Sequence, residues 1–310
     1  MKNKKQKGGR SKNLSSNLFV LSILIYPLIL FVIFYVIVNF NSILMAFKKI
    51  TITGEESFIG FQNFVDFIAD VRGGNAWYRI SLTNSLKMYI ICLVISLPLY
   101  IFFSYVLFKK CMGNKVMRAI VMIPQIISGF IMCLVFKKFV SMGLPAFMKS
   151  LLGYEEFPNL LMDPRYAFGT NIFYMIWISF STSLIVYPNA MNEIDDGILE
   201  AGRIDGINSM FSELWYLILP LIYPTISTFL ITGFAAILTN AGTLATFYMY
   251  DAPYEAYNMG YLYWQQVANS SSYIAYPKLA AGGLLMTLLV APLTILLKYL
   301  LEKFGPVVDY

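Results

Sequence analysis

The sequence is poor in the residue types that most often carry out chemistry or bind metals. It contains no histidine and three cysteines in 310 residues, and only 13% of its residues are charged. The cysteines, Cys92, Cys111 and Cys133, show no paired spacing, which argues against both a disulfide framework and a metal site. The chain also lacks a G-x-x-x-x-G-K-[ST] phosphate-binding loop, so we do not expect it to hydrolyse ATP itself.

Apolar residues, in contrast, are abundant. They make up 58% of the sequence, more than a water-soluble domain can readily hide from solvent. A bilayer core of about 30 Å requires roughly 20 apolar helical residues. A charge-free stretch at 256–277 carries too many amide and hydroxyl groups for lipid, and we predict a loop there. We predict one transmembrane helix in each of six other charge-free stretches: 13–47, 88–108, 119–136, 166–192, 214–250 and 279–297.

The distribution of basic residues predicts the orientation. Six basic and no acidic residues precede the first apolar stretch, between Lys2 and Lys12. The length of that stretch and its lack of a small-residue cleavage pattern favour an uncleaved anchor over a signal peptide. The positive-inside rule places this segment and the basic loop from Lys109 to Arg118 in the cytoplasm. Six spans then return the C-terminus to the same side.

The loop between the fourth and fifth spans holds six acidic residues but only one basic residue, Arg203, although it falls on the cytoplasmic side. Acidic residues count little in the positive-inside rule, and a docked protein partner would explain their excess. These observations together divide the chain into five predicted parts. They are a basic cytoplasmic N-terminus (1–17), the first transmembrane helix (18–46), an extracellular loop with an interfacial segment (47–81), a core transmembrane domain (82–300) that includes the loop at 188–220, and a cytoplasmic tail (301–310).

The acidic loop has the pattern of two short helices. Asp195 stands where a helix N-cap is expected, and Gly206 can end that helix in a left-handed conformation. Asn208 or Ser209 can cap a second helix, and Pro220 marks the turn into the fifth span. Apolar residues at helical spacing give the first helix a narrow apolar face. These residues are Ile194, Ile198, Ala201 and Ile204.

The same loop resembles a known family. The run Glu200-Ala201-Gly202-Arg203-Ile204-Asp205-Gly206, followed by 211–220 ending in Leu219-Pro220, is similar to the EAA signature of type I ABC importer permeases. Three further segments, 58–64, 81–86 and 118–124, resemble elements of the sugar-permease branch, which includes the maltose-type and sn-glycerol-3-phosphate-type permeases. The resemblance implies an all-α integral membrane fold of six transmembrane helices, with a cytoplasmic coupling helix between helices 4 and 5.

In that family the coupling helix sits in a cleft of a separate ATPase. The resemblance implies that Glu200 pairs with a basic residue of the ATPase, that Ala201 and Gly202 allow close approach, and that Gly206 forms the turn. Gly202 departs from the usual alanine, which should loosen the helix by up to about 1 kcal/mol. The segment between Gly206 and Phe211 is one residue longer than usual, so the register of the second helix stays open. The expected ATPase-coupling set is Ile198, Leu199, Glu200, Ala201, Gly202, Ile204, Asp205 and Gly206.

The resemblance also implies a function and partners. We expect a permease subunit, in the bacterial cytoplasmic membrane, of an ATP-driven importer for a sugar or oligosaccharide delivered by an extracellular binding protein. The expected partners are a second homologous permease, two ABC ATPase subunits, the binding protein and the lipid bilayer, without nucleic acid. ATP and Mg are expected on the ATPase, so this chain would be neither an enzyme nor a cofactor-binding subunit. A permease for another polar solute, such as glycerol phosphate, stays open.

Polar and aromatic side chains at membrane depth are candidates for the substrate pathway. Hydroxyl, amide and aromatic groups suit a neutral, hydroxyl-rich solute, although each also suits helix packing in lipid. An ion-coupled secondary transporter is the alternative from a different class, but it would ordinarily place an ionisable residue inside the bilayer. The nearest such residue is Lys87, at the outer end of a span. The pathway candidates are Tyr174, Trp177, Ser181, Thr232, Asn240 and Tyr248.

Overall fold

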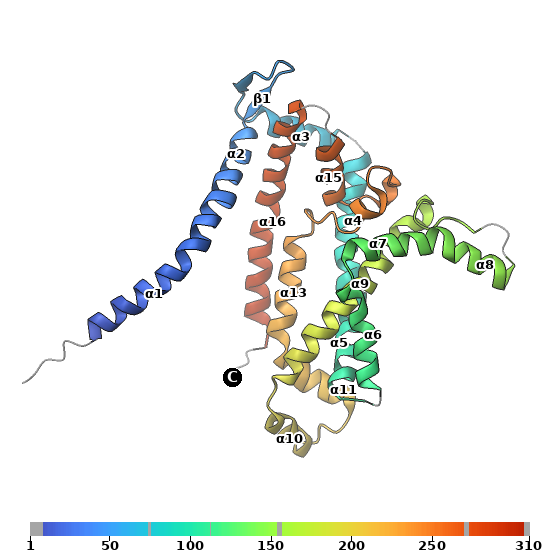
Figure 1. The fold of residues 1–310 in the computed structure, drawn as a ribbon. Coiled ribbons are helices and arrows are strands. Elements are labelled where there is room, and N and C mark those ends of the chain that lie inside the picture. The colour runs from blue at the N-terminus through green and yellow to red at the C-terminus, as the bar shows by residue number, and fades with distance from the viewer. Residues whose placement is uncertain (1–8, 74–75, 112, 154–156, 270–272, 307–310) are drawn as a thin grey trace, which may run out of the picture. The chain divides into compact units, whose positions relative to one another are not determined.

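A computed structural model describes residues 9–73, 76–111, 113–153, 157–269 and 273–306, without the side chains of 9–18, Lys115 and Tyr273 (Figure 1). The chain forms two compact units, and each is described by itself. The first comprises Met1–Phe67 with Ser272–Leu284, and the second comprises Ile68–Ser271 with Leu285–Tyr310. The basic side chains between Lys2 and Lys12, on which the predicted orientation depends, lie outside the described residues.

The first unit joins a long helical segment to a short hairpin. Asn63 is buried, and its side-chain amide donates to the carbonyls of Ala46 at 2.8 Å and Lys48 at 2.7 Å, which fixes the turn between helix and hairpin. The predicted extracellular loop at 47–81 therefore contains regular structure. The elements are α1 (Gly9–Leu30), the π-helical η1 (Phe31–Ile37), α2 (Val38–Met45), the antiparallel strands β1 (Lys48–Ile50) and β2 (Glu56–Phe58), the start of α3 (Gln62–Arg72), the 3-10 helix η6 (Tyr273–Ala275) and the start of α16 (Tyr276–Phe304).

All the regular secondary structure among the described residues of the second unit is helical. Several of its helices run directly into one another through π-helical segments, so that 76–108, for example, form one continuous helix. The elements are α4 (Ala76–Ile91), η2 (Cys92–Ser96), α5 (Leu97–Phe108), α6 (Asn114–Ile126), α7 (Gly129–Lys138), η3 (Phe139–Gly143), α8 (Leu144–Leu152), α9 (Pro164–Asn192), α10 (Asp196–Ile204), α11 (Met210–Glu213), η4 (Leu214–Ile218), α12 (Leu219–Leu221), α13 (Tyr223–Ala235), α14 (Leu244–Tyr248), η5 (Tyr254–Ala256) and α15 (Met259–Asn269), with the rest of α16.

The described residues contain five helices that are long and apolar enough to cross a membrane. A sixth span is possible if Met210–Leu221 and Tyr223–Ala235, which meet at a bend of 67°, count as one. Counted in this way, the six candidate spans agree in number with the six predicted spans. The chain is therefore an integral membrane protein. The five helices are Phe19–Met45, Ala76–Phe108, Gly129–Leu152, Pro164–Asn192 and Tyr276–Phe304.

The predicted span at 119–136 is wrong. Helix α6 ends at Ile126 and α7 begins at Gly129, because Ile127 and Ser128 take extended conformations with ψ angles of 138° and 131°. The candidate span is instead Gly129–Leu152, which continues past the lysines at 137 and 138. The prediction failed because it used charged residues to mark the ends of helices.

The predicted loop at 256–277 is also wrong over much of its length, because α15 occupies it. Several of its described polar groups find partners inside the protein, whereas Ser270, Ser271 and Ser272 lie outside the described residues. The side-chain amide of Asn84 donates to the carbonyls of Glu255 at 2.7 Å and Tyr257 at 2.8 Å, and the Asn258 side chain accepts from the Tyr261 amide at 2.7 Å. Burial raises the pKa of the Tyr261 hydroxyl, which stays protonated and donates to the Met249 carbonyl at 2.9 Å.

A buried apolar cluster joins α5 and α9 to the segment from α10 to α13. Figure 1 shows α10 beyond the ends of α9 and α13, so the cluster connects a helix outside the bundle with the bundle itself. We call it the coupling cluster. Its members are Tyr100, Ile101, Tyr105, Tyr187, Met191, Ile194, Leu199, Ile218, Ile222 and Ile226.

The contact between α15 and the residues after α13 generates a stability prediction. A Cβ atom at Gly260 would lie 2.4 Å from the backbone carbonyl carbon of Asn240, which has no flexible side chain to move away. We expect Gly260→Ala to destabilise the fold by about 1–3 kcal/mol. Thermal unfolding of the detergent-purified protein measures the effect. Gly129→Ala, where no atom lies within 4 Å, is the control, and an equal melting temperature for both variants would contradict the packing described.

Candidate functional site

Helix α10 begins at the predicted N-cap. The Asp195 carboxylate accepts from the backbone amide of Gly197 at 2.7 Å, and Asp196 lies in the first turn. Both carboxylates lie near the positive end of the helix dipole, which they stabilise. The predicted N-cap is confirmed.

The same helix ends at the predicted glycine. Gly206 has a φ of 93°, a left-handed conformation that costs glycine little. Its amide donates to the Arg203 carbonyl at 3.2 Å, and the Ile207 amide donates to the Gly202 carbonyl at 2.9 Å. These two bonds form a Schellman motif, which satisfies carbonyls at the helix end. Local hydrogen bonds therefore define α10 at both ends.

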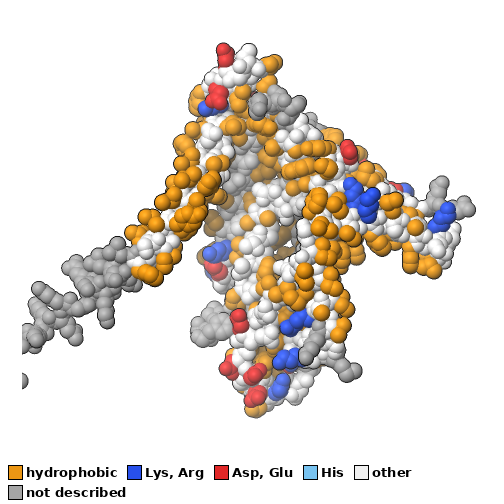
Figure 2. Space-filling model, viewed as in Figure 1, with side chains coloured by type: hydrophobic (Ala, Val, Ile, Leu, Met, Phe, Trp, Pro, Cys, Tyr) orange, Lys and Arg blue, Asp and Glu red, His pale blue; other side chains and the backbone are white. Residues whose placement is uncertain are grey.

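The two faces of α10 differ in burial. Leu199 and Gly202 are buried against the rest of the second unit, whereas Ile198 is 40% exposed and Ile204 is 86% exposed. The four residues of the predicted apolar face therefore do not form one surface. Ile194 precedes the N-cap and is buried in the coupling cluster, whereas the other three lie on α10 and are exposed. Figure 2 shows charged side chains gathered at the end of the unit where α10 lies. The exposed part of the coupling set, which we call the outer face of α10, consists of Ile198, Glu200, Ala201, Ile204, Asp205 and Gly206.

Gly202 lies on the inner face of α10, where it allows close packing within the chain. A Cβ atom there would lie 2.4 Å from Cδ1 of Leu217 in η4. The Leu217 side chain thus fills the space where the methyl group of an alanine, the residue expected from the resemblance, would lie.

The register of the second short helix is set by its N-cap. Of the two candidates, Ser209 is the cap: its hydroxyl accepts from the Ser212 amide at 3.1 Å, and the Ser212 hydroxyl accepts from the Ser209 amide at 3.2 Å. This capping box starts α11, which passes directly into the π-helical η4. A π-helix bonds i to i+5 and holds more residues per turn than an α-helix. The bend into α13 follows at Ile222, two residues after the predicted Pro220.

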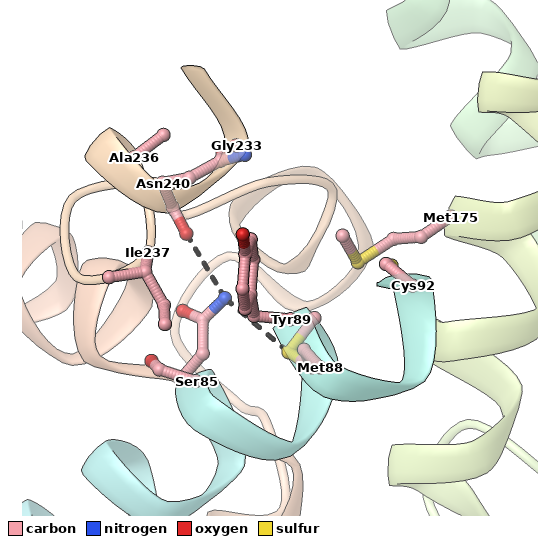
Figure 3. Close-up of a pocket in the computed structure, with 10 residues that line it drawn as sticks. Ser85, Met88, Tyr89, Cys92, Met175, Gly233, Ala236, Ile237 and Asn240 are labelled. Atoms are coloured by element: carbon pink, nitrogen blue, oxygen red, sulfur yellow. Dashed lines mark hydrogen bonds between the residues drawn. The ribbon is translucent and has the colours of Figure 1, made fainter. Parts of the chain in front are cut away.

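A cavity of about 170 Å³ lies between α4, α9 and the C-terminal end of α13 (Figure 3). The figure shows Ser85, Met88 and Tyr89 on α4 facing Asn240 across it. The Asn258 side-chain amide donates to the Asn240 carbonyl at 3.1 Å and thereby holds one wall in place. A second cavity of about 300 Å³ shares Tyr89, Cys92 and Gly233 with the first. We call the two together the membrane cavity.

Hydroxyl groups line the second part of the membrane cavity. They come from α9 and from the continuous helix that α4, η2 and α5 form. Neither part has a charged residue among its described lining residues. The hydroxyl-bearing residues are Tyr89, Ser96, Tyr100, Ser179, Thr182, Ser183 and Tyr187.

Three of the six predicted pathway residues are buried in the protein interior. Tyr174 is fully buried, with its ring centroid 4.8 Å from those of both Phe136 and Phe247. Ser181 is 2% exposed. The Tyr248 hydroxyl is buried, donates to the Leu161 carbonyl at 2.8 Å and accepts from Asn171 at 3.2 Å. The structure uses these side chains for packing and internal hydrogen bonds.

The other three predicted pathway residues are exposed but do not share one surface. Asn240 lines the membrane cavity. Thr232 lines a different cavity, between α13 and α16, and its hydroxyl donates to the Thr228 carbonyl at 2.9 Å. Trp177 is 38% exposed and lines neither part of the membrane cavity.

The prediction missed the wall that α4, η2 and α5 supply. Tyr89, Cys92, Ser96 and Tyr100 all line the membrane cavity, and they recur at intervals of three or four residues. That spacing places them on one side of a helix. The signal was present in the sequence, within the second predicted span at 88–108.

Similar proteins are known, although no family model matches the chain. The multiple sugar-binding transport system permease protein MsmF of Streptococcus mutans is 30% identical over 218 residues, which cover 70% of this chain and 73% of that protein. The trehalose/maltose transport system permease protein MalF of Thermococcus litoralis is 27% identical over 186 residues, 59% of this chain and 61% of that protein. The galactooligosaccharides transport system permease protein GanP of Bacillus subtilis is 24% identical and aligns over 46% of its own length.

A solved structure has the same fold. A chain of a bacterial ABC transporter that imports the acidic polysaccharide alginate superposes with a TM-score of 0.75 at 19% identity. The match covers 94% of this chain and 98% of that chain. It confirms the predicted fold class over nearly the whole length.

The contact between Gly202 and Leu217 generates a second prediction. We expect the cost of moving the Leu217 side chain to offset the helix propensity of about 1 kcal/mol that Gly202→Ala adds, so that this variant alone changes stability by about 1 kcal/mol or less. In the double variant with Leu217→Ala, the destabilisation should be smaller than the sum of the two single effects. Thermal unfolding of the four proteins measures the coupling. Strictly additive effects would show that the two side chains do not compete for space.

Proposed function

Because this chain belongs to the family of ABC sugar-transporter permeases, we propose that it forms part of the membrane pathway of an ATP-driven carbohydrate importer. The three named relatives carry sugars or oligosaccharides according to their names. The membrane cavity supports the same class of solute, since hydroxyl, amide and aromatic groups bind a neutral, hydroxyl-rich molecule. An anionic solute such as glycerol phosphate would favour a cationic side chain, and none is among the described lining residues.

The observation that carries the proposal for energy coupling is the exposed outer face of α10. Ile204 is 86% exposed on a helix whose ends are both fixed by hydrogen bonds, and Glu200 and Asp205 lie beside it. A small apolar surface with acidic neighbours suits a protein partner with a basic, partly apolar cleft. We infer that the partner is an ATPase subunit, and that Glu200 pairs with a basic residue there.

The same arrangement supports a topology. If α10 docks on a cytoplasmic ATPase, the end of the second unit that bears α10 faces the cytoplasm. With four spans before α10 and two after it, both termini would then lie on the cytoplasmic side of the membrane. The tail predicted at 301–310 begins inside α16, which runs to Phe304; residues 307–310 lie outside the described part. A bacterial cytoplasmic membrane is the location that these features and the relatives support.

The remaining partners complete the proposed transporter. A second, homologous permease would form the other half of the pathway, and two ATPases would dock, one on each permease. An extracellular binding protein would deliver the carbohydrate, and a transporter structure with a similar chain contains such a protein bound to an alginate pentasaccharide. Closure of the ATPases on ATP would move α10 and open the membrane cavity outward.

The charge of Glu200 provides the test of coupling. We expect Glu200→Lys, in a complex purified with its partner subunits, to lower substrate-stimulated ATPase activity and uptake by about tenfold or more, because a reversed charge in an interface is costly. Glu302→Lys is the charge-matched control, since that carboxylate is exposed and 3.6 Å from Lys298. Unchanged uptake and ATPase activity in an intact Glu200→Lys complex would remove the role assigned to Glu200.

The glycine shared by both parts of the membrane cavity provides a test of the pathway. We expect Gly233→Leu to block uptake, since its side chain would occupy the cavity, while the complex still assembles and hydrolyses ATP. Gly169→Leu adds the same side chain to a separate apolar cavity between α7 and α9 and should leave uptake close to wild type. Uptake and ATPase activity in liposomes are the readouts. Equal uptake by the two variants would show that the membrane cavity is not on the pathway.

A further inference from the structure

One ion pair connects the acidic loop to the helix that lines the membrane cavity. Glu213 ends α11, and its carboxylate pairs with the ammonium group of Lys109, the C-cap residue of α5. The side chains are only 10% and 23% exposed, respectively. The Lys109 ammonium also lies 5.5 Å from the ring centroid of Tyr105 and 5.9 Å from that of Phe108. Two charges this enclosed lose much of their hydration, so their partnership determines where both can lie.

The position of this pair distinguishes it from two exposed ion pairs among the described residues. Lys48 with Glu56 and Lys298 with Glu302 join residues close in sequence, and their side chains are 35–62% exposed. Lys109 and Glu213 are 104 positions apart (213 − 109) and belong to different helices. An exposed local pair contributes little, whereas an enclosed long-range pair fixes two helices relative to each other.

Apolar contacts of the coupling cluster accompany the ion pair. Leu199 from the inner face of α10, Ile218 from η4 and Tyr105 from α5 are all buried in that cluster. Apolar attraction is not directional in itself. The ion pair adds a charged contact at one defined position between the same elements.

The other end of this connection is the membrane cavity. Helix α5 continues through η2 into α4 as one helix of 33 residues, Ala76–Phe108, and Lys109 follows it directly. Tyr89, Cys92 and Ser96 of this helix line the membrane cavity. A displacement applied at Lys109 therefore reaches the cavity wall along continuous helix. The wall is π-helical from Cys92 to Ser96, and such segments occur often at functional sites.

We propose that the Lys109–Glu213 ion pair is the joint that transmits movement of the acidic loop to the cavity-lining helix. This inference rests on the proposed function, since it assumes that an ATPase moves α10. Both residues are positioning residues that contact neither the solute nor ATP. Their loss should separate ATP hydrolysis from transport, because the ATPase would still move α10 while the cavity wall followed it less closely.

The experiment compares transport per ATP hydrolysed in liposomes that hold the complete complex and its binding protein. The variants are Glu213→Gln, Lys109→Gln and the reversed pair Lys109→Glu with Glu213→Lys. We expect each single variant to hydrolyse ATP but to transport at least about fivefold less solute per ATP hydrolysed. A loss of this size is within the range of ordinary coupling free energies. The reversed pair should recover most of the loss. Lys298→Gln with Glu302→Gln is the control, because it removes an exposed pair of the same chemistry.

Several outcomes would overturn the proposal. Unchanged transport per ATP in the single variants would do so, as would a reversed pair as impaired as they are. Equal losses of ATP hydrolysis and uptake would indicate only a folding role. If the glutamine variants do not assemble, Glu213→Asp retains the charge with a shorter reach, and normal transport per ATP in that variant would count against the joint. A wild-type complex that fails to move carbohydrate on ATP would instead refute the proposed function.

Discussion

The structure depends on the division of α10 into a buried face and an exposed face. The buried face is anchored by Leu199, and Gly202 allows Leu217 to pack against the helix backbone. Because both ends of α10 are fixed by hydrogen bonds of the chain itself, the exposed face is held in place before any partner binds. Preorganisation of this kind lowers the cost of docking. It also means that a force on the outer face is passed to the coupling cluster.

Two kinds of contact connect the acidic loop to α5. The apolar residues of α5, α9 and α10 supply contact area, and the Lys109–Glu213 ion pair adds a charged contact at one defined position. The continuous helix 76–108 then leads to the membrane cavity, whose hydroxyl groups face an interior without charged groups among its described lining residues. The proposed docking surface, the connection and the proposed solute cavity thus lie along one set of helices. An importer driven by a separate ATPase would require this arrangement.

The sequence predicted the local structure of the acidic loop better than the boundaries of the spans. The caps at Asp195, Gly206 and Ser209 were predictable because each depends on hydrogen bonds to residues two to five positions away. The break at Ile127 was not, because the charge-free pattern runs across it without interruption. Helix α15 was not predicted because partners of its polar groups, such as Tyr78 for Gln266, are far away in sequence. Nor does hydropathy reveal that Tyr174 and Tyr248 are buried, because burial depends on tertiary packing.

The central claim is that the outer face of α10 binds an ATPase subunit, and photo-crosslinking tests it directly. A photoreactive residue in place of Ile204, which is 86% exposed, should form a covalent product with the ATPase in the purified complex. The same residue in place of Leu199, which is 7% exposed on the inner face, should crosslink only within this chain. A product with lipid or with another subunit from position 204, or an ATPase product from position 199 alone, would contradict the account.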